Sequence, residues 1–240
     1  LVLNHTSDQH PWFQQSRSSR ENPFRDFYIW REPCKGGQRP NNWQSVFGGS
    51  AWQFDPQTDE YYYHMFYPGQ PDINWRNPVV KDAMLNVFRF WLERGADGFR
   101  LDVFNMYYKD DQFRDNPPAL GIRGFERQHH IYDCDRPEMI PLLRDIRQVL
   151  DSYSDRYAIG ETFQHSPRKA AMYCAPGLLH AAFDFSFLEC PWKPARFLST
   201  IQRWEEALHE ESWPTYVLGN HDTRRIATRY GRGDDDERLK

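Results

Sequence analysis

The sequence lacks the patterns that mark several large classes of protein. Its four cysteines are scattered, with no CxxC pair and no metal-ligand spacing. They therefore indicate free thiols in a reducing compartment, not a disulfide framework or a zinc site. No apolar run is long enough for a transmembrane helix or for the apolar core of a signal peptide. We therefore expect a cytoplasmic protein with no membrane partner.

A strong charge of either sign is also missing. The 34 acidic residues nearly balance the 30 lysines and arginines, which leaves a net charge of -4. A balance this close supplies no basic surface for nucleic acid and no strong attraction to an anionic membrane. We therefore expect no nucleic-acid partner, and the composition indicates no particular oligomeric state.

Three short apolar segments are present, and each runs into a carboxylate. Residues 98–102 end at Asp102, residues 157–161 end at Glu161, and residues 216–222 end at Asp222. Helical stretches separate these segments, which indicates parallel strands joined by helices. The carboxyl ends of such strands are where α/β barrels place their chemistry. The sequence therefore predicts three acids gathered at one edge of a parallel sheet.

The residues beside two of these acids differ in charge. Arg100 and Asp102 are two positions apart, so on a strand their side chains point to the same side. A guanidinium that close lowers the pKa of a carboxyl, as a nucleophile requires, although a structural ion pair has the same pattern. Glu161 follows Ile159 and Gly160 with no adjacent cation in the sequence. Its pKa is therefore expected to be free to rise, as that of a proton donor must.

The clearest helix is expected over residues 78–94. Asn77 is a suitable N-cap, Pro78 suits the first helical position, and Gly95 is a stop signal. The residues that recur at helical spacing and predict its buried stripe are Val80, Met84, Val87, Phe88 and Trp91. The other predicted elements are helices at 137–152, 194–210 and 223–230, and strands at 1–5, 51–55, 60–66, 181–185 and 215–220.

Five segments, in order along the chain, carry a resemblance to a known family. They are Leu3-Asn4-His5, Gln70-Pro71-Asp72-Ile73-Asn74, residues 98–102, Gly160-Glu161 and Asn220-His221-Asp222. On these segments the chain resembles the α-amylase family of glycoside hydrolases. The segment at 70–74 is similar to a signature of its exo-acting α-glucosidase and oligo-1,6-glucosidase branch.

The resemblance implies an α/β fold, a partial (β/α)8 TIM barrel with about strands three to seven. Residues 1–5 and 75–240 would form the barrel, and residues 6–74 a small subdomain inserted after the third strand. Residues 6–74 show no alternation of strand and helix, and a loop of that length must carry structure or function. The chain begins inside an apolar run without a methionine, so we expect a partial sequence.

The resemblance also implies roles for the three acids in a retaining, double-displacement hydrolysis. Asp102 matches the nucleophile, Glu161 the acid/base, and Asp222 the acid that holds sugar hydroxyls and stabilises the transition state. Retention requires the first two carboxyl groups to lie about 5–5.5 Å apart.

Four further residues match positions that bind the sugar in the family. His5 and His221 match sugar-binding histidines, and Arg100 matches the arginine beside the nucleophile. Phe66 matches an aromatic residue of the sugar pocket, although a core phenylalanine would have the same pattern. Aromatic residues make up 16% of the chain and suit both purposes.

The expected substrates are small maltose- and isomaltose-type oligosaccharides with α-1,4 or α-1,6 bonds. Transglycosylating relatives, such as trehalose synthase or sucrose isomerase, and trehalose-6-phosphate hydrolases remain alternatives. A non-catalytic relative, such as a transporter heavy chain, would have substituted acids and a membrane anchor. We expect no cofactor and no metal, since the branch's usual calcium site lies in an early loop outside this sequence. The pair His129-His130 is read as part of a polar loop, with a metal site as the lesser alternative.

Overall fold

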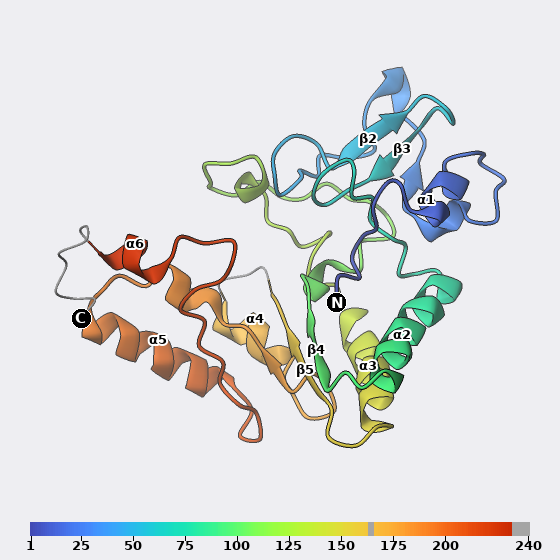
Figure 1. Ribbon diagram of the computed structural model, residues 1–240. Coiled ribbons are helices and arrows are strands. Elements are labelled where there is room, and N and C mark those ends of the chain that lie inside the picture. Colours follow the sequence, from blue (N-terminus) through green and yellow to red (C-terminus); the bar gives the residue numbers. More distant parts are fainter. Residues whose placement is uncertain (163–165, 232–240) are drawn as a thin grey trace. The chain divides into compact units, whose positions relative to one another are not determined.

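The computed structural model describes residues 1–162 and 166–231 (Figure 1). It divides into two compact units. The first comprises Leu1–Ala96 and Asp102–Leu142, and the second comprises Asp97–Leu101 and Leu143–Lys240. Each unit contains a three-stranded sheet of its own.

The sheet of the first unit is antiparallel, with strand order β1-β3-β2. Its strands are β1 (Trp30–Arg31), β2 (Trp52–Asp55) and β3 (Glu60–Tyr63). The strands predicted at 51–55 and 60–66 are thus confirmed, although the second stops at Tyr63. It stops early because the Met65 N–H donates to the side chain of Asp72, at 2.8 Å, and not to a neighbouring strand.

A cluster of buried aromatic side chains packs beside this sheet. The rings of Trp43 and Trp52 are stacked at 6.3 Å, and the ring of Tyr63 meets Trp43 edge-on at 5.5 Å. Phe66 and Val103 belong to the same cluster. Aromatic pairs in these geometries contribute about 0.5–1.5 kcal/mol each beyond the area they bury. The cluster therefore fixes one candidate site residue, Phe66, and the residue that follows another, Asp102.

Helix α2 (Pro78–Glu93) begins and ends where the sequence predicts. The Asn77 side chain accepts the Val79 N–H at 2.9 Å, which caps the first turn. Gly95, with φ at 91°, lies in the left-handed region that ends helices and that glycine adopts without a steric penalty.

The buried stripe of α2 differs from the prediction at two positions, because Val87 is only partly buried, with Leu85 buried beside it, and Trp91 is exposed. Trp91 was expected inside the core, but its side chain is 46% exposed, and Leu92, at 2%, is buried in its place. Phe88 and Leu92 are four residues apart and lie on one face, whereas the three-residue step to Trp91 turns toward solvent.

The remaining helices are α1 (Pro11–Ser16), α3 (Met139–Asp151), α4 (Pro167–Met172), α5 (Pro194–Ala207) and α6 (Ile226–Tyr230). Short 3-10 turns lie at Arg25–Phe27, Lys35–Gly37, Phe104–Met106, Phe125–Arg127 and Phe185–Leu188. The helices predicted at 137–152 and 194–210 are confirmed with slightly shorter bounds, and the one at 223–230 begins three residues late. None of the helices in the described part of the chain has the length and apolarity needed to cross a membrane.

The sheet of the second unit is parallel, with strand order β4-β5-β6. Its strands are β4 (Gly98–Leu101), β5 (Tyr157–Gly160) and β6 (Ala181–Ala182). Gly98 pairs with Tyr157, and a Cβ at position 98 would clash with the Tyr157 carbonyl, so close pairing there requires glycine. Two of the three apolar segments that end in an acid are thus parallel strands as predicted, whereas the third, at 216–222, is not a strand of this sheet.

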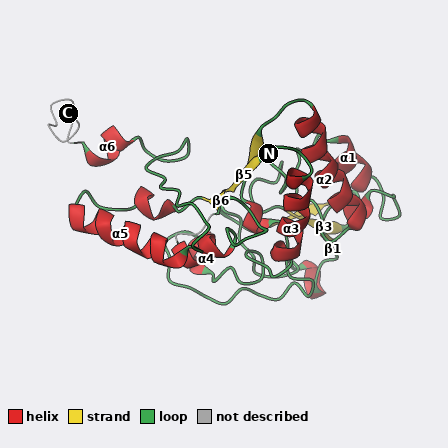
Figure 2. Ribbon diagram, turned by 90° about the horizontal axis from the view of Figure 1, so that it is seen from below, coloured by secondary structure: helices red, strands yellow, loops and turns green. Residues whose placement is uncertain are grey.

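Helices α4 and α5 pack against each other in this unit (Figure 2). The fully buried Trp204 of α5 meets Ala170 and Ala171 of α4, and Ala182 of β6 belongs to the same cluster. Small side chains on α4 leave the room that the indole requires. Trp204 therefore anchors α5 on α4.

Three predicted strands are wrong in extent. The one expected at 181–185 is limited to β6, and a 3-10 turn begins at Phe185. Residues 215–220 contribute one isolated parallel bridge, between Tyr216 and Asp184. Residues 1–5 form no strand, because the Leu1 carbonyl accepts the Asp102 N–H at 2.9 Å and the chain then turns to another partner. The Asn4 carbonyl accepts from Ile73, so this segment bonds to residues 71–73 and not along a sheet.

Three histidines, one buried and two partly buried, make the stability of the fold dependent on pH. Burial is the largest cause that lowers the pKa of His5, His64 and His180 below the ordinary value of 6.5. The unfolded chain then binds these protons more readily than the folded one. We expect the free energy of unfolding to decrease as the pH falls through about 6.5 toward the folded pKa values.

The slope of the free energy of unfolding against pH is measured by urea unfolding of the complete protein. The pH values run from about 7.5 to about 5, because histidine titrates in this range. His64 is 3% exposed and its Nδ1 lies 3.0 Å from the Phe66 carbonyl, so His64→Asn keeps a donor there and removes a titrating group. The slope should become shallower in His64→Asn and stay unchanged in His209→Asn, which alters an exposed histidine. Equal slopes in all three proteins would contradict the assignment.

Candidate active site

The predicted site residues fall into two groups, one in each unit. His5, Phe66 and Asp102 lie in the first unit, and Arg100, Glu161, His221 and Asp222 lie in the second.

Glu161 is the acid at the carboxyl end of β5. Its N–H donates to the Leu101 carbonyl at 2.9 Å, so the β4–β5 hydrogen bonds continue up to the residue that carries the carboxylate. The Glu161 side chain is 7% exposed. The placement predicted for this acid, at the end of a parallel strand, is therefore what the structure has.

Arg100 has a partner that the sequence did not indicate, because it forms an ion pair with Glu161. Its Nη2 lies 2.5 Å from Glu161 Oε2, so the expectation that no cation acts on Glu161 is wrong. Arg100 pairs in register with Ile159, and Ile159 and Glu161 point to the same face. Neighbouring strands lie about 4.8 Å apart, whereas residues two apart on one strand are separated by roughly 6.6 Å. Sequence adjacency could not reveal a partner on the next strand.

A cavity of about 730 Å³ opens beside this pair within the second unit. Its lining includes Arg100, Glu161, Phe183, Phe185, Asn220 and His221. A carboxylate, a guanidinium and aromatic walls together suit a ligand that has both hydroxyl groups and apolar ring faces. The sequence did not identify Phe183 and Phe185 as site residues. The only indication was their position in the strand predicted at 181–185.

Asp222 is close to His221 and open to solvent. Its Oδ2 lies 3.3 Å from His221 Nε2, and the side chains are 66% and 73% exposed respectively. The Asp222 N–H donates to Asn220 Oδ1 at 3.1 Å, which forms a tight local turn. The Asn-His-Asp segment is therefore held by its own polar groups, with His221 on the cavity wall.

In the first unit, His5 lies close to both Phe66 and Asp102. The His5 and Phe66 rings are 5.3 Å apart and tilted by 57°. Burial is the largest cause that lowers the His5 pKa, and the charges of Asp72 and Asp102 act against it. A neutral imidazole next to an aromatic ring and a carboxylate is able to hydrogen-bond a sugar hydroxyl.

A buried lysine that the sequence did not indicate organises this group. The Lys109 ammonium lies 2.7 Å from Asp72 Oδ2 and 3.2 Å from Asn4 Oδ1, and it also donates to the Met106 carbonyl. Asn4 donates to Asp72 at 2.8 Å, which closes the network immediately before His5. Lys109 and Asp72 are almost completely buried. No local pattern at position 109 distinguishes it from a surface lysine.

Val103, directly after Asp102, has a backbone conformation that β-branched residues rarely adopt. Its φ of 36° lies in the left-handed region. Such strain costs of order 1–3 kcal/mol and persists where surrounding packing fixes the residue, often at functional sites. Val103 is 5% exposed and belongs to the aromatic cluster described above, which provides that packing.

The histidine pair at 129–130 is part of a loop. His130 Nδ1 lies 2.9 Å from Asp133 Oδ2, and its Nε2 lies 2.7 Å from the Phe125 carbonyl. Among the described residues, one group has potential metal-ligand atoms close together, and it consists of His130, Asp133 and Cys134. A metal ion there would have to displace hydrogen bonds of His130, so an absent metal remains a prediction.

Comparisons with known proteins identify the family. Residues 1–240 match the alpha-amylase catalytic domain. The chain is 40% identical over 245 residues to oligo-1,6-glucosidase of Parageobacillus thermoglucosidasius, covering 96% of this chain and 43% of that protein. It is 43% identical over 252 residues to the "Probable alpha-glucosidase" of Rhizobium meliloti, covering 97% of this chain and 45% of the relative.

A crystal structure of an alpha-glucosyl transfer enzyme superposes with a TM-score of 0.92 and 40% identity, covering 98% of this chain and 45% of the other. The chain belongs to the alpha-amylase family of glycoside hydrolases, whose catalytic domain is a (β/α)8 barrel, and it forms part of such a barrel. It spans less than half the length of the curated relatives that it matches.

The hydrogen-bonded network of Lys109, Asp72 and Asn4 leads to a prediction about stability. Lys109→Met would leave the Asp72 carboxylate buried without its ammonium, and breaking a buried pair in this way costs roughly 3–5 kcal/mol. Urea unfolding of the complete protein at neutral pH measures the loss, and the double variant Lys109→Met/Asp72→Asn should recover part of it. Lys35→Met, at an exposed lysine, should stay within about 0.5 kcal/mol of the parent. A Lys109→Met protein as stable as Lys35→Met would show that the network does not stabilise the fold.

Proposed function

We propose that the complete protein is a retaining, exo-acting α-glucosidase that hydrolyses α-1,4 or α-1,6 bonds of small maltose- and isomaltose-type oligosaccharides. The observation that carries the proposal is a carboxylate with a guanidinium at the end of a parallel strand, Glu161 with Arg100, on the wall of a cavity with aromatic sides. The names of the two curated relatives, an oligo-1,6-glucosidase and a probable alpha-glucosidase, agree with it.

In the proposed mechanism, the Asp102 carboxylate attacks the anomeric carbon while Glu161 gives its proton to the leaving oxygen. The glycosidic bond breaks, and a glucosyl ester forms on Asp102. Glu161, now ionised, takes a proton from water, whose oxygen attacks the same carbon and releases glucose with its configuration retained. Both carboxyl groups thereby return to their starting protonation states.

The ion pair with Arg100 sets a condition on the first step. A guanidinium beside a carboxylate favours its charged form, which is the form that Glu161 needs as a base and not as an acid. We therefore propose that Arg100 turns toward the substrate when Glu161 is protonated, and returns when it is ionised. Arg100 beside Glu161 thus opposes the first half-reaction, in which Glu161 is an acid, and favours the second, in which Glu161 is a base.

Four residues are proposed to bind the glucosyl unit. They are His5, Phe66, His221 and Asp222. His5 lies beside Phe66, and His221 lies on the cavity wall, which supports these roles. No cofactor is required by this chemistry.

The domain boundaries and the location of the protein are also proposals. Residues 6–74 would form the inserted subdomain, and 1–5 with 75–240 the barrel. All four cysteines are free thiols, three of them buried, and free thiols persist in reducing compartments. We propose a cytoplasmic location on that ground.

A transglucosylase is the second candidate. The structural neighbour with the TM-score of 0.92 is an alpha-glucosyl transfer enzyme, and the same two carboxylates serve transfer when a sugar hydroxyl replaces water. Hydrolysis and transfer therefore differ in which acceptor reaches the glucosyl ester.

The stereochemistry of the first product tests the proposal. The complete protein is incubated with maltose and with isomaltose, and proton NMR follows the anomeric signals before they equilibrate. We expect α-glucose to form first from the non-reducing end. First-formed β-glucose, or internal cleavage of starch as the main activity, would contradict the proposal. New disaccharides in place of glucose would instead support the transfer reading.

The roles of the two acids have a separate test. Asp102→Asn and Glu161→Gln should both abolish hydrolysis of maltose. On an aryl glucoside with an excellent leaving group, Glu161→Gln should keep part of its first step, because the leaving oxygen needs no proton. Asp102→Asn should not, and Glu206→Gln, at an exposed glutamate, is the matched control with full activity. Equal losses in the two acid variants on the aryl substrate would refute the assignment.

A further inference from the structure

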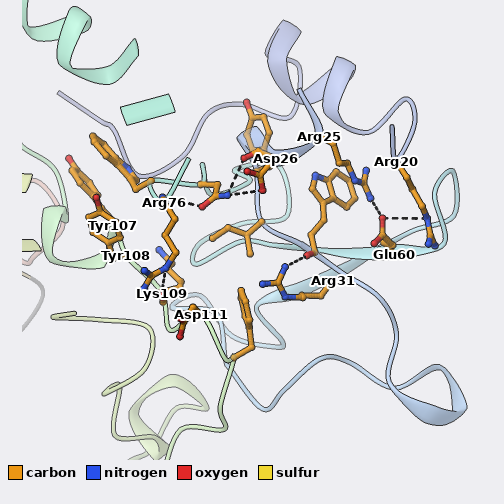
Figure 3. Close-up of a pocket in the computed structure, with 16 residues that line it drawn as sticks. Arg20, Arg25, Asp26, Arg31, Glu60, Arg76, Tyr107, Tyr108, Lys109 and Asp111 are labelled. Carbon is orange, nitrogen blue, oxygen red and sulfur yellow. Dashed lines mark hydrogen bonds and ion pairs between the residues drawn. The ribbon is translucent and has the colours of Figure 1, made fainter. Parts of the chain in front are cut away.

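A second polar cavity lies within the first unit and contains none of the residues assigned to the active site. Its volume is about 290 Å³, at the lower end of the roughly 300–1,000 Å³ typical of small-molecule pockets. It lies beside β1, and its opposite wall comes from segments near residues 74–76 and 107–113 (Figure 3).

One wall of the cavity is fixed by paired charges. Arg25 donates to Glu60, and Arg20 lies 3.5 Å from the same carboxylate. The Arg25 guanidinium also stacks 3.6 Å from the Trp30 ring. The charges of Arg20 and Arg25 are neutralised by Glu60, so these two side chains form a rigid wall and do not provide an anion-binding site.

The opposite wall is fixed in the same way. Arg76 donates to the Lys109 carbonyl at 2.7 Å and pairs with Glu138 at 2.5 Å. Behind it, the rings of Trp75 and Tyr107 are stacked at 4.7 Å, almost parallel. Two rigid walls therefore face each other across the cavity.

Arg31 lies between these walls (Figure 3). Its Nη1 donates to the Trp30 carbonyl at 2.7 Å, and its guanidinium lies 3.7 Å from the Phe113 ring. Within residues 1–162 and 166–231, it forms no ion pair within 4.0 Å. Burial is the largest cause that lowers its pKa, while the charges of Asp26 and Glu60 raise it. The planar group is thus held by stacking, with Nε and Nη2 available as donors.

Two carboxylates on the lining provide acceptors. Asp26 accepts one hydrogen bond from the Asn74 amide at 3.0 Å, which leaves further lone pairs on its oxygens. Asp111 is exposed on the same lining. Donors from Arg31 and acceptors from Asp26 and Asp111 therefore face one small space.

We propose that this cavity is a second, non-catalytic binding site for a neutral mono- or disaccharide. Sugar hydroxyls both donate and accept, so they match a guanidinium and carboxylates together. A phosphate or carboxylate ligand fits less well, because it would meet Asp26 and Asp111 while most cations here are already paired. The argument rests on the chemistry of the cavity and does not depend on the proposed hydrolysis.

Fluorine NMR of the complete protein, labelled with 5-fluorotryptophan, tests the site. Trp30 and Trp75 line the cavity and Trp204, buried in the second unit, is the reference. Maltose is titrated into a Glu161→Gln background, so that the probe persists if the protein hydrolyses it. We expect saturable shifts of the Trp30 and Trp75 signals that weaken at least about tenfold in affinity in Arg31→Gln.

Two variants make the outcome specific. Arg39→Gln, which alters an exposed arginine of the same unit outside the cavity, should leave the titration unchanged. Asp26→Asn should weaken maltose binding, as Arg31→Gln does, and Arg31→Gln in the parent background should keep kcat/KM on an aryl glucoside. Absence of saturable shifts, shifts insensitive to both cavity variants, or binding of inorganic phosphate in preference to maltose would each overturn the proposal. Loss of hydrolysis with intact shifts would affect the proposed function alone.

Discussion

The buried ammonium of Lys109 is the contact on which the geometry of the first unit depends. Removing a charged amine from water costs several kcal/mol unless oxygen partners surround it, and here they come from separate chain segments. Asn4 immediately precedes His5, and the Met106 carbonyl ends the turn that follows Asp102. One ion therefore fixes the flanks of a candidate sugar ligand and of the candidate nucleophile.

Paired charges have a common role in both candidate sites. In the cavity of the first unit, most guanidinium groups are engaged by carboxylates or carbonyls, and the few uncommitted polar atoms of Arg31 and Asp26 define what can bind. Beside Glu161, the single guanidinium of Arg100 biases a protonation equilibrium.

Much of the fold follows from local sequence signals. The cap at Asn77, the first-turn Pro78 and the stop at Gly95 set the bounds of α2, because they act over one turn of helix. Strand ends are harder, since a strand exists only through a partner distant in the chain. The segment at 1–5 bonds to residues 71–73 and to Asp102, which no property of its own five residues specifies.

The sequence by itself determined which residues are candidates for the chemistry. An acid that follows an apolar run, and the order of five motifs, are local patterns that do not depend on the fold. Tertiary structure decided which of those residues are partners. Arg100 forms an ion pair with Glu161 on the next strand, since the parallel register of β4 and β5 brings the two side chains within reach. It also decided the burial of Lys109, because desolvation depends on segments that fold over a residue and not on its neighbours in sequence.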